Sequence, residues 1–271
     1  MKFSKYHGTG NDFILIDYIS SEFDYSGFAI KICNRHKGVG ADGLMYYSES
    51  DKADIMMNYI NSDGSIGEMC GNGIRCFVRF LSDNNVISKK NFKVETLAGI
   101  MDVTIIDDIN IMINMGERTL ESKDMLKNNE KLINHEINVK DRKFIITSLL
   151  FGVPHTVIEV DKITEELALK YGPILEKNEI FKNGSNINFV EINDENNISV
   201  ITWERGAGLT LSCGTGSCAA AIVMNENGKV NNDINVKVLG GKLNVKLDKD
   251  VFLTGEAIKI CDGSFYGKYI I

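Results

Sequence analysis

Apolar and polar residues alternate in several short stretches of the chain, and this period of two predicts β-strands with one buried face. The alternation is clearest at residues 101–106 and 243–247. Two other stretches, 74–80 and 217–223, contain neither glycine nor proline, and they suit helices. The pattern therefore predicts a chain of mixed α and β structure.

The chain repeats this arrangement once. A Cys-Gly-polar-Gly motif occurs at residues 70–73 and again at 213–216, and each copy leads into one of the predicted helices. A turn glycine then precedes each alternating strand, 29 residues after the cysteine at Gly99 and 28 residues after it at Gly241. Two similarities in the same order, at nearly the same separation, indicate a duplicated unit.

The length of 271 residues fits two domains of ordinary size. We expect a boundary near Gly116, where an apolar stretch ends and a charged stretch begins. The N-terminal domain, 1–116, then carries Cys70, and the C-terminal domain, 117–256, carries Cys213. Each is expected to be a small α/β domain whose helix starts directly after its cysteine.

Composition and charge narrow the class of protein. The chain is 44% apolar and 25% charged, which is typical of a soluble globular protein. Its net charge is −7 and its basic residues are scattered, so we expect no nucleic-acid partner. The first residues contain no apolar run long enough for a signal sequence or a membrane span. We therefore expect a cytoplasmic protein with no membrane partner.

The six cysteines are expected to be free thiols, because nothing in the sequence indicates secretion. Five residues lie between Cys70 and Cys76, and four lie between Cys213 and Cys218. Neither spacing matches the CxxC pairs of structural zinc sites. No metal site is therefore expected. The cysteines outside the two motifs are expected to be buried packing residues. These cysteines are Cys33, Cys76, Cys218 and Cys261.

The position of Cys70 and Cys213 at two helix starts suggests acid/base chemistry. Taken singly, each motif could be no more than a turn that needs glycine for its backbone angles. A helix N-terminus, however, can hold a carboxylate and lowers the pKa of a nearby thiol. Two such termini could hold one carboxylate, with a thiolate on one face of the α-carbon and a thiol on the other. One sulfur would remove the α-proton while the other donates a proton, which inverts the stereocentre.

Further motifs follow one another along the chain at His7–Phe13, Gly38–Gly43, Asn61–Ser65, Glu68–Gly73, Pro154-His155, Glu204–Gly208 and Ser212–Gly216. With these motifs the sequence resembles the diaminopimelate epimerases along nearly its whole length. It implies two pseudo-symmetric α+β domains, each a curved and mostly antiparallel sheet or barrel around a central helix. It also implies a C-terminal strand at about 257–271 that returns to the first domain, a homodimer, and an amino-acid substrate that is processed without a cofactor.

Carried over position by position, the resemblance makes Cys70 and Cys213 the two catalytic bases and His155 and Glu204 the polar pair that assists them. It implies that the substrate is contacted at Asn11, Asn61, Gly71, Asn72, Val153, Asn186, Arg205, Gly214 and Thr215. The backbone at 71–72 and 214–215 would bind the reacting carboxylate. Three of the others, Asn61, Asn186 and Arg205, would read the distal end of the substrate.

Two positions depart from the family pattern. Val153 stands where the family usually has asparagine, and Leu209 stands where it usually has glutamate. A charged distal group would lose a hydrogen bond at Val153, which costs about 1–3 kcal/mol when the group stays unsatisfied. The family substrate is LL- or meso-diaminopimelate, and this substitution leaves histidine, through a histidine racemase activity, and lanthionine as alternatives.

Two other classes of protein fit the sequence less well. A non-catalytic amino-acid-binding protein would need no cysteine on both sides of its ligand. A thiol–disulfide redox protein generally carries CxxC at a helix start, which this chain lacks.

Overall fold

The computed structural model describes residues 1–128 and 131–266, and the chain forms two compact units. Among the described residues, the first unit consists of residues 1–114 and 254–266, and the second of residues from 115 to 253. The boundaries expected from the sequence, 116 and 256, lie in the same two strands as the observed ones, β8 (Asn110–Glu117) and β17 (Asp250–Glu256). Of the expected C-terminal strand, residues 267–271 lie outside the described residues.

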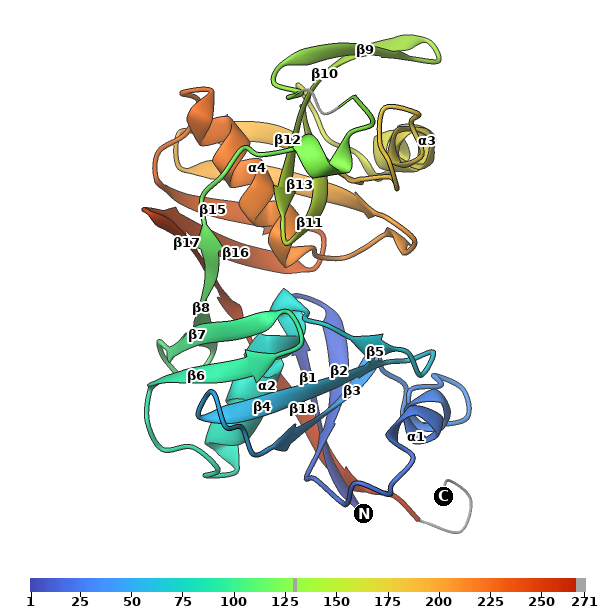
Figure 1. Ribbon diagram of the computed structural model, residues 1–271, viewed down its shortest axis with the longest axis vertical. Coiled ribbons are helices and arrows are strands. Elements are labelled where there is room, and N and C mark those ends of the chain that lie inside the picture. The colour runs from blue at the N-terminus through green and yellow to red at the C-terminus, as the bar shows by residue number, and fades with distance from the viewer. Residues whose placement is uncertain (129–130, 267–271) are drawn as a thin grey trace. The chain divides into compact units, whose positions relative to one another are not determined.

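The first unit is built on a curved sheet (Figure 1). Its further elements are β1 (Lys2–Gly8), β2 (Asn11–Ile16), α1 (Tyr25–Ile32), β3 (Gly43–Ser48), β4 (Ile55–Asn61), β5 (Ile66–Gly67), α2 (Gly71–Asp83), β6 (Asn91–Thr96), β7 (Gly99–Ile105) and β18 (Ile258–Ser264). Strand β1 lies antiparallel to both β18 and β2, and β2 is parallel to β3. Strand β4 is antiparallel to β3 and parallel to β6, and β7 lies antiparallel between β6 and β8.

The second unit repeats this plan. Its further elements are η1 (Lys123–Met125), β9 (His135–Val139), β10 (Arg142–Phe151), β11 (Val153–Glu159), α3 (Glu165–Glu176), β12 (Asn186–Asp194), β13 (Asn197–Glu204), β14 (Gly208–Leu209), α4 (Gly214–Glu226), β15 (Asp233–Val238) and β16 (Gly241–Leu247). Strand β10 lies antiparallel to β9 and β11, and β11 is parallel to β12. Strand β13 is antiparallel to β12 and parallel to β15, which is antiparallel to β16.

The order of elements and pairings from β1 to β7 therefore matches that from β10 to β16. In each unit two strands precede a peripheral helix, two longer strands and one short strand follow, and a 13-residue helix leads into the final hairpin. This confirms the predicted α+β fold with two pseudo-symmetric halves. The turn glycines of the sequence repeat begin β7 and β16, where Gly99 and Gly241 have positive φ values of 127° and 151°.

The helices that follow the two motifs lie at the centre of their units. Helix α4 contacts strands β10 to β13 on one side and β15 and β16 on another, and residues 216–224 are all buried. Helix α2 contacts β1, β2, β7 and β18, and residues 71–81 are buried. Helix α4 has apolar or small residues on nearly all sides, which suits a helix inside a core, whereas α2 also carries the buried Arg75 and Arg79. Each fully buried large apolar side chain, such as Phe77, contributes about 1.5–3 kcal/mol.

Three of the four cysteines outside the motifs are buried as expected, with Cys33, Cys76 and Cys218 at most 3% exposed. The expectation was wrong for Cys261, which is exposed. It lies on β18, where every side-chain-bearing residue is exposed, so alternation along this strand does not bury one face. Among the described residues, no helix is both long enough and apolar enough to span a membrane.

Candidate active site

Cys70 caps the N-terminus of α2. Its backbone is extended, with φ −136° and ψ 120°, and its sulfur accepts a hydrogen bond from the backbone N–H of Gly73 at 3.4 Å. This position is usually held by Ser, Thr, Asp or Asn, whose side-chain oxygen accepts the same bond. A sulfur at this place receives the partial positive charge of the helix N-terminus, which favours the thiolate.

Cys213 caps α4 in the same way. Its φ and ψ are −119° and 111°, and its sulfur accepts from the N–H of Gly216, also at 3.4 Å. The Thr215 hydroxyl lies 3.6 Å from the same sulfur. The structure thus places both motif cysteines at equivalent positions of the two units, as the sequence repeat predicted.

In the first unit, an amide held by a charged network contacts Cys70. The Cys70 thiol donates to Oδ1 of Asn11 at 3.5 Å, while Nδ2 of Asn11 donates to the carboxylate of Asp42. Arg35 donates to Asp42 at 2.8 Å and to Asp12 at 2.6 Å, so the carboxylates are held in place. The sequence motifs pointed to Asn11, but not to the charges that orient its amide.

A buried arginine supports the first turn of α2. Arg75 is 0% exposed; its Nη1 donates to the carbonyl of Gly71 at 2.9 Å and its Nη2 to Oδ1 of Asn72 at 3.0 Å. The Thr9 hydroxyl donates to the same Asn72 oxygen at 3.2 Å. The side chain of Asn72 is thus used to hold the turn. Arg75 could have been noticed in the sequence as a charged residue within a helix of core composition.

In the second unit, Cys213 lies beside a carboxyl group. Its thiol is hydrogen-bonded to Glu204, and the Thr210 hydroxyl donates to Oε1 of Glu204 at 2.7 Å. Burial raises the pKa of Glu204, and these two hydrogen bonds offset part of the increase. The two sequence-predicted residues Cys213 and Glu204 are thus brought together.

His155 is the most deeply enclosed of the candidate residues. It is 0% exposed, and its Nδ1 lies 3.2 Å from Nδ2 of Asn188. Burial, with a smaller effect from the charge of Arg205, lowers the pKa of His155 to about 3, so the imidazole is neutral at physiological pH. Asn188 was not among the residues predicted from the sequence. Its signal was a polar residue two positions after Asn186, within the apolar first half of β12, which places both side chains on one face.

Asn186 and Arg205 lie together at the turn that follows β13. The Asn186 side chain accepts from the backbone N–H of Arg205 at 2.7 Å, and Nη1 of Arg205 donates to the carbonyl of Asn183 at 3.2 Å. The buried Glu176 carboxylate accepts from Nε1 of Trp203 at 2.7 Å and thereby fixes the end of β13. The exposed guanidinium of Arg205 is thus held by the segment that precedes β12.

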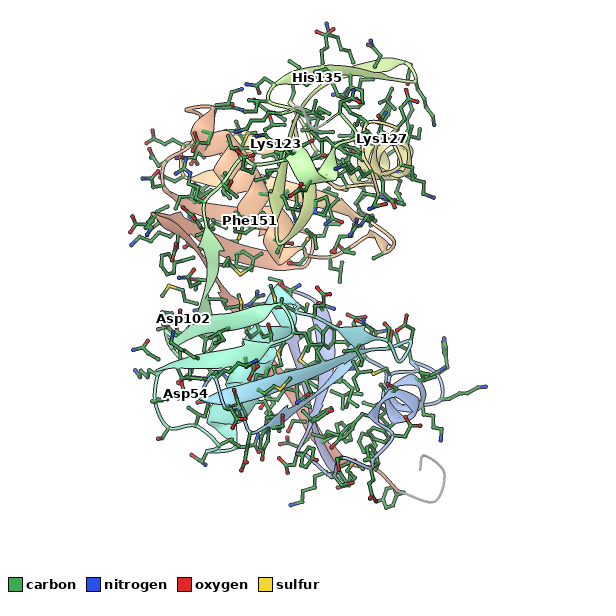
Figure 2. All side chains as sticks on the ribbon, in the orientation of Figure 1. Asp54, Asp102, Lys123, Lys127, His135 and Phe151 are labelled. Atoms are coloured by element: carbon green, nitrogen blue, oxygen red, sulfur yellow. The ribbon has the colours of Figure 1, made fainter. Side chains whose placement is uncertain are left out.

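The remaining predicted residues lie at strand ends. Asn61 ends β4, and its amide donates to the hydroxyl of Ser65 at 2.9 Å. Val153 begins β11, is 37% exposed, and pairs across the hairpin with Phe151, which Figure 2 labels. Gly71 and Gly214 are the first residues of α2 and α4. The side chain of Asn11 is thus hydrogen-bonded to Cys70, whereas the side chain of Asn61 is hydrogen-bonded to Ser65 in the turn that follows β4.

A metal centre has no support in the described part of the chain. Across residues 1–128 and 131–266, no group of three or more His, Cys, Asp or Glu side chains is placed so that it could hold a metal ion.

The chain is similar to known proteins along nearly its whole length. The family model described as diaminopimelate epimerase matches residues 3–121 and 147–260. The diaminopimelate epimerase of Alkaliphilus metalliredigens is 40% identical over 100% of this chain and 99% of its own length. That of Clostridium perfringens is 41% identical over 98% of this chain and 99% of its own.

Solved structures share the fold at low sequence identity. A hydroxyproline epimerase from Agrobacterium vitis has a TM-score of 0.68 at 14% identity, covering 97% of this chain and 90% of its own. A PhzF-family phenazine biosynthesis protein from Bacillus anthracis has a TM-score of 0.66 at 16% identity, covering 97% and 98%.

The fold and the two equivalent thiols define a class of duplicated α+β proteins with a cysteine at the start of each central helix. Within that class, the match to the family model and the identities of about 40% over full length identify the group. The chain belongs to the diaminopimelate epimerase family.

Proposed function

We propose that this protein is a cofactor-independent amino-acid epimerase that interconverts LL- and meso-diaminopimelate by a two-base thiol mechanism. The observation that carries the proposal is the equivalence of Cys70 and Cys213: each sulfur caps a central helix and accepts a backbone N–H at 3.4 Å. Inversion at one carbon requires an acid and a base on opposite faces, and the repeat supplies one thiol from each unit.

In this mechanism the thiolate of one cysteine removes the α-proton and the thiol of the other donates a proton to the opposite face. The helix N-termini stabilise the thiolate. Their backbone N–H groups at 71–72 and 214–215 bind the substrate carboxylate. Carbanion character at the α-carbon is then stabilised by hydrogen bonds, which are effective in a site that excludes water.

The other candidate residues have supporting roles in this proposal. His155 and Glu204 assist at the reacting centre, the latter through its hydrogen bond to Cys213. Asn11 contacts the substrate beside Cys70. Asn61, Asn186 and Arg205 recognise the distal amino and carboxyl groups, for which the exposed guanidinium of Arg205 offers a matching charge. A cytoplasmic homodimer is part of the proposal.

Val153 favours a second candidate substrate. Its isopropyl group is 37% exposed and presents no donor or acceptor at the position where the family usually has asparagine. A side chain that is flat and partly apolar, such as the imidazole of histidine, loses less at this position than a charged carboxylate does. Histidine racemisation is therefore the main alternative, and lanthionine epimerisation is another.

The test is solvent exchange at the α-carbon. Reduced protein is incubated in D₂O with LL-diaminopimelate, L-histidine, lanthionine or other L-amino acids, and α-proton loss is followed by NMR and stereochemistry by chiral chromatography. Fast exchange and inversion with diaminopimelate are expected. Exchange with histidine alone would replace the substrate and implicate Val153. Binding without exchange of any substrate would make the protein an amino-acid-binding protein and would overturn the proposal.

A further inference from the structure

The most informative group that the proposed mechanism leaves unexplained is the hydrogen-bond network beneath the first turn of α4. It joins His155, Asn188, Thr202 and the backbone of Thr156, all at most 4% exposed. Buried polar groups are costly unless their donors and acceptors are matched. The pattern of bonds in such a network therefore fixes which atoms carry protons.

The orientation of the Asn188 amide follows from its neighbours. Nδ2 lies 3.2 Å from the carbonyl oxygen of Thr156, which can only accept, so this end of the amide is the NH₂ group. Oδ1 accepts from the hydroxyl of Thr202 at 3.0 Å. The Thr156 carbonyl alone assigns the amide, and the Thr202 hydroxyl, which can donate or accept, is compatible with that assignment.

The second hydrogen on Nδ2 of Asn188 points to Nδ1 of His155 at 3.2 Å. Because Nδ2 donates, Nδ1 must offer a lone pair. A neutral imidazole then carries its proton on Nε2. Nε2 of His155 is buried and has no hydrogen-bond partner among the described residues. A buried, unpaired donor is costly in a folded protein, and such a group is typical of a site that awaits a ligand.

We propose that Asn188 is a positioning residue that holds His155 as the neutral Nε2–H tautomer, so that His155 serves the substrate as a hydrogen-bond donor and not as a base. This inference rests on the proposed function, because the acceptor is taken to be an anionic oxygen of the bound amino acid. The lowered pKa of His155 agrees with it, since protonation of Nδ1 would place two donors against each other.

The matching place in the first unit shows that the fold does not require this network. Strand pairing aligns His155 with Asn186 and Asn188 with Thr202, just as it aligns Phe13 with Gly43 and Met45 with Tyr59. Asn188 thus corresponds to Met45, and His155 to Phe13. Packing alone is satisfied there by apolar side chains. The polar network in the second unit therefore has another use.

The test is the ¹⁵N NMR spectrum of the full-length reduced protein labelled at its histidine ring nitrogens. The chain has four histidines, so His155 is assigned by its loss in a His155→Gln variant. The expected result is an unprotonated Nδ1 and a protonated Nε2 that persist from pH 8 to pH 5, well below the usual histidine pKa of about 6.5. A protonated Nδ1, or titration of His155 near the usual value, would overturn the inference. This readout needs no substrate, so it can fail while the exchange activity stands, and the reverse.

An Asn188→Asp variant adds a functional readout. A carboxylate can only accept, so it would draw a proton onto Nδ1 and move the His155 signals to those of the other tautomer or the imidazolium. The rate of α-proton exchange should fall on the order of 10²-fold, as when one preorganised donor is lost from an active site. Asn193→Asp is the matched control, because Asn193 lies on the same strand, is exposed, and donates from its side chain to the hydroxyl of Ser199 at 2.8 Å. An Asn188→Asp variant that folds and keeps full activity would contradict the inference, and the wild-type spectrum decides the tautomer if the variant does not fold.

Discussion

The first turns of α2 and α4 are nearly identical in backbone geometry, yet they rest on different chemistry. Beneath the turn after Cys70, an added Cβ on Gly73 would meet the methyl group of Met45 at 2.2 Å and the ring of Phe13 at 3.4 Å. The equivalent Cβ on Gly216 would meet Oδ1 of Asn188 at 2.4 Å and the hydroxyl of Thr202 at 3.1 Å. The side chains nearest Gly73 are thus apolar, whereas those nearest Gly216 belong to a polar network.

The polar group that contacts the first thiol comes from the edge of the site, whereas the buried Arg75 holds the first turn of α2 through Gly71 and Asn72. Asn11 reaches Cys70 from a network in which Arg35 and Asp42 are 53% and 42% exposed. In the second unit, the polar groups are internal. The two thiols therefore hold equivalent positions in the repeat but have different surroundings. Substitutions that act on one unit and not on the other test this comparison.

The largest effect is expected where the two units are alike. Cys70→Ser and Cys213→Ser should each lower epimerisation by about 10³-fold or more while leaving the fold intact, because serine is a far weaker acid than cysteine and each thiol acts as acid or base. The measurement is the rate of stereochemical inversion, with circular dichroism as a check of folding. Cys261→Ser is the control, since Cys261 is exposed. Wild-type inversion by either active-site variant would exclude the two-base mechanism.

A smaller effect is expected from adding one methyl group beneath each turn. In Gly73→Ala, the thioether end of Met45 can move aside, so we expect less than about 1 kcal/mol change in the free energy of unfolding. In Gly216→Ala, the hydrogen-bonded Asn188 cannot move without breaking its network, and a loss of about 1–3 kcal/mol is expected together with lower activity. Urea unfolding and the exchange assay measure both. Equal losses in the two variants would remove the distinction between an apolar and a polar support.

A distinct effect of pH above pH 5 should come from His155 of the second unit. The pKa of His155 is depressed to about 3 in the folded state, so its contribution to stability is present above the unfolded pKa of 6.5 and is lost as the pH falls toward 3. From pH 7.5 to pH 5 this loss is about 2 kcal/mol, because the unfolded chain binds a proton that the folded protein does not. His155→Gln should remove this part of the pH dependence in urea unfolding, whereas His36→Gln, at an exposed position, should retain it. An unchanged dependence in His155→Gln would show that His155 can be protonated in the folded state.

Much of the fold could be read from the sequence because its signals are local. Residues 74–80 and 217–223, which lack glycine and proline, lie in α2 and α4, and the glycines that precede the alternating strands begin β7 and β16. The burial of Cys261 was predicted wrongly because it depends on whether other elements cover β18. The residues of the strand itself do not reveal whether it is covered.

The site was predictable to the extent that its residues lie in short motifs. Cys70, Cys213 and His155 were singled out by their neighbours in the chain. Arg75 and Asn188 were missed, although each is a polar residue in an apolar segment, because their partners are distant in sequence. Arg75 bonds to the Thr9 hydroxyl at 3.1 Å, 66 residues away, and Asn188 bonds to His155, 33 residues away.

The sequence by itself determined the duplicated architecture, the family and the two helix-capping thiols, because periodicity and local motifs are properties of contiguous residues. Only the tertiary structure decided what surrounds each thiol. Strand pairing sets Asn188 against Thr202 and His155, and it sets Met45 against Tyr59 at the matching place. The proton position on His155 follows from these distant contacts, since a hydrogen bond depends on where its donor and acceptor meet in space.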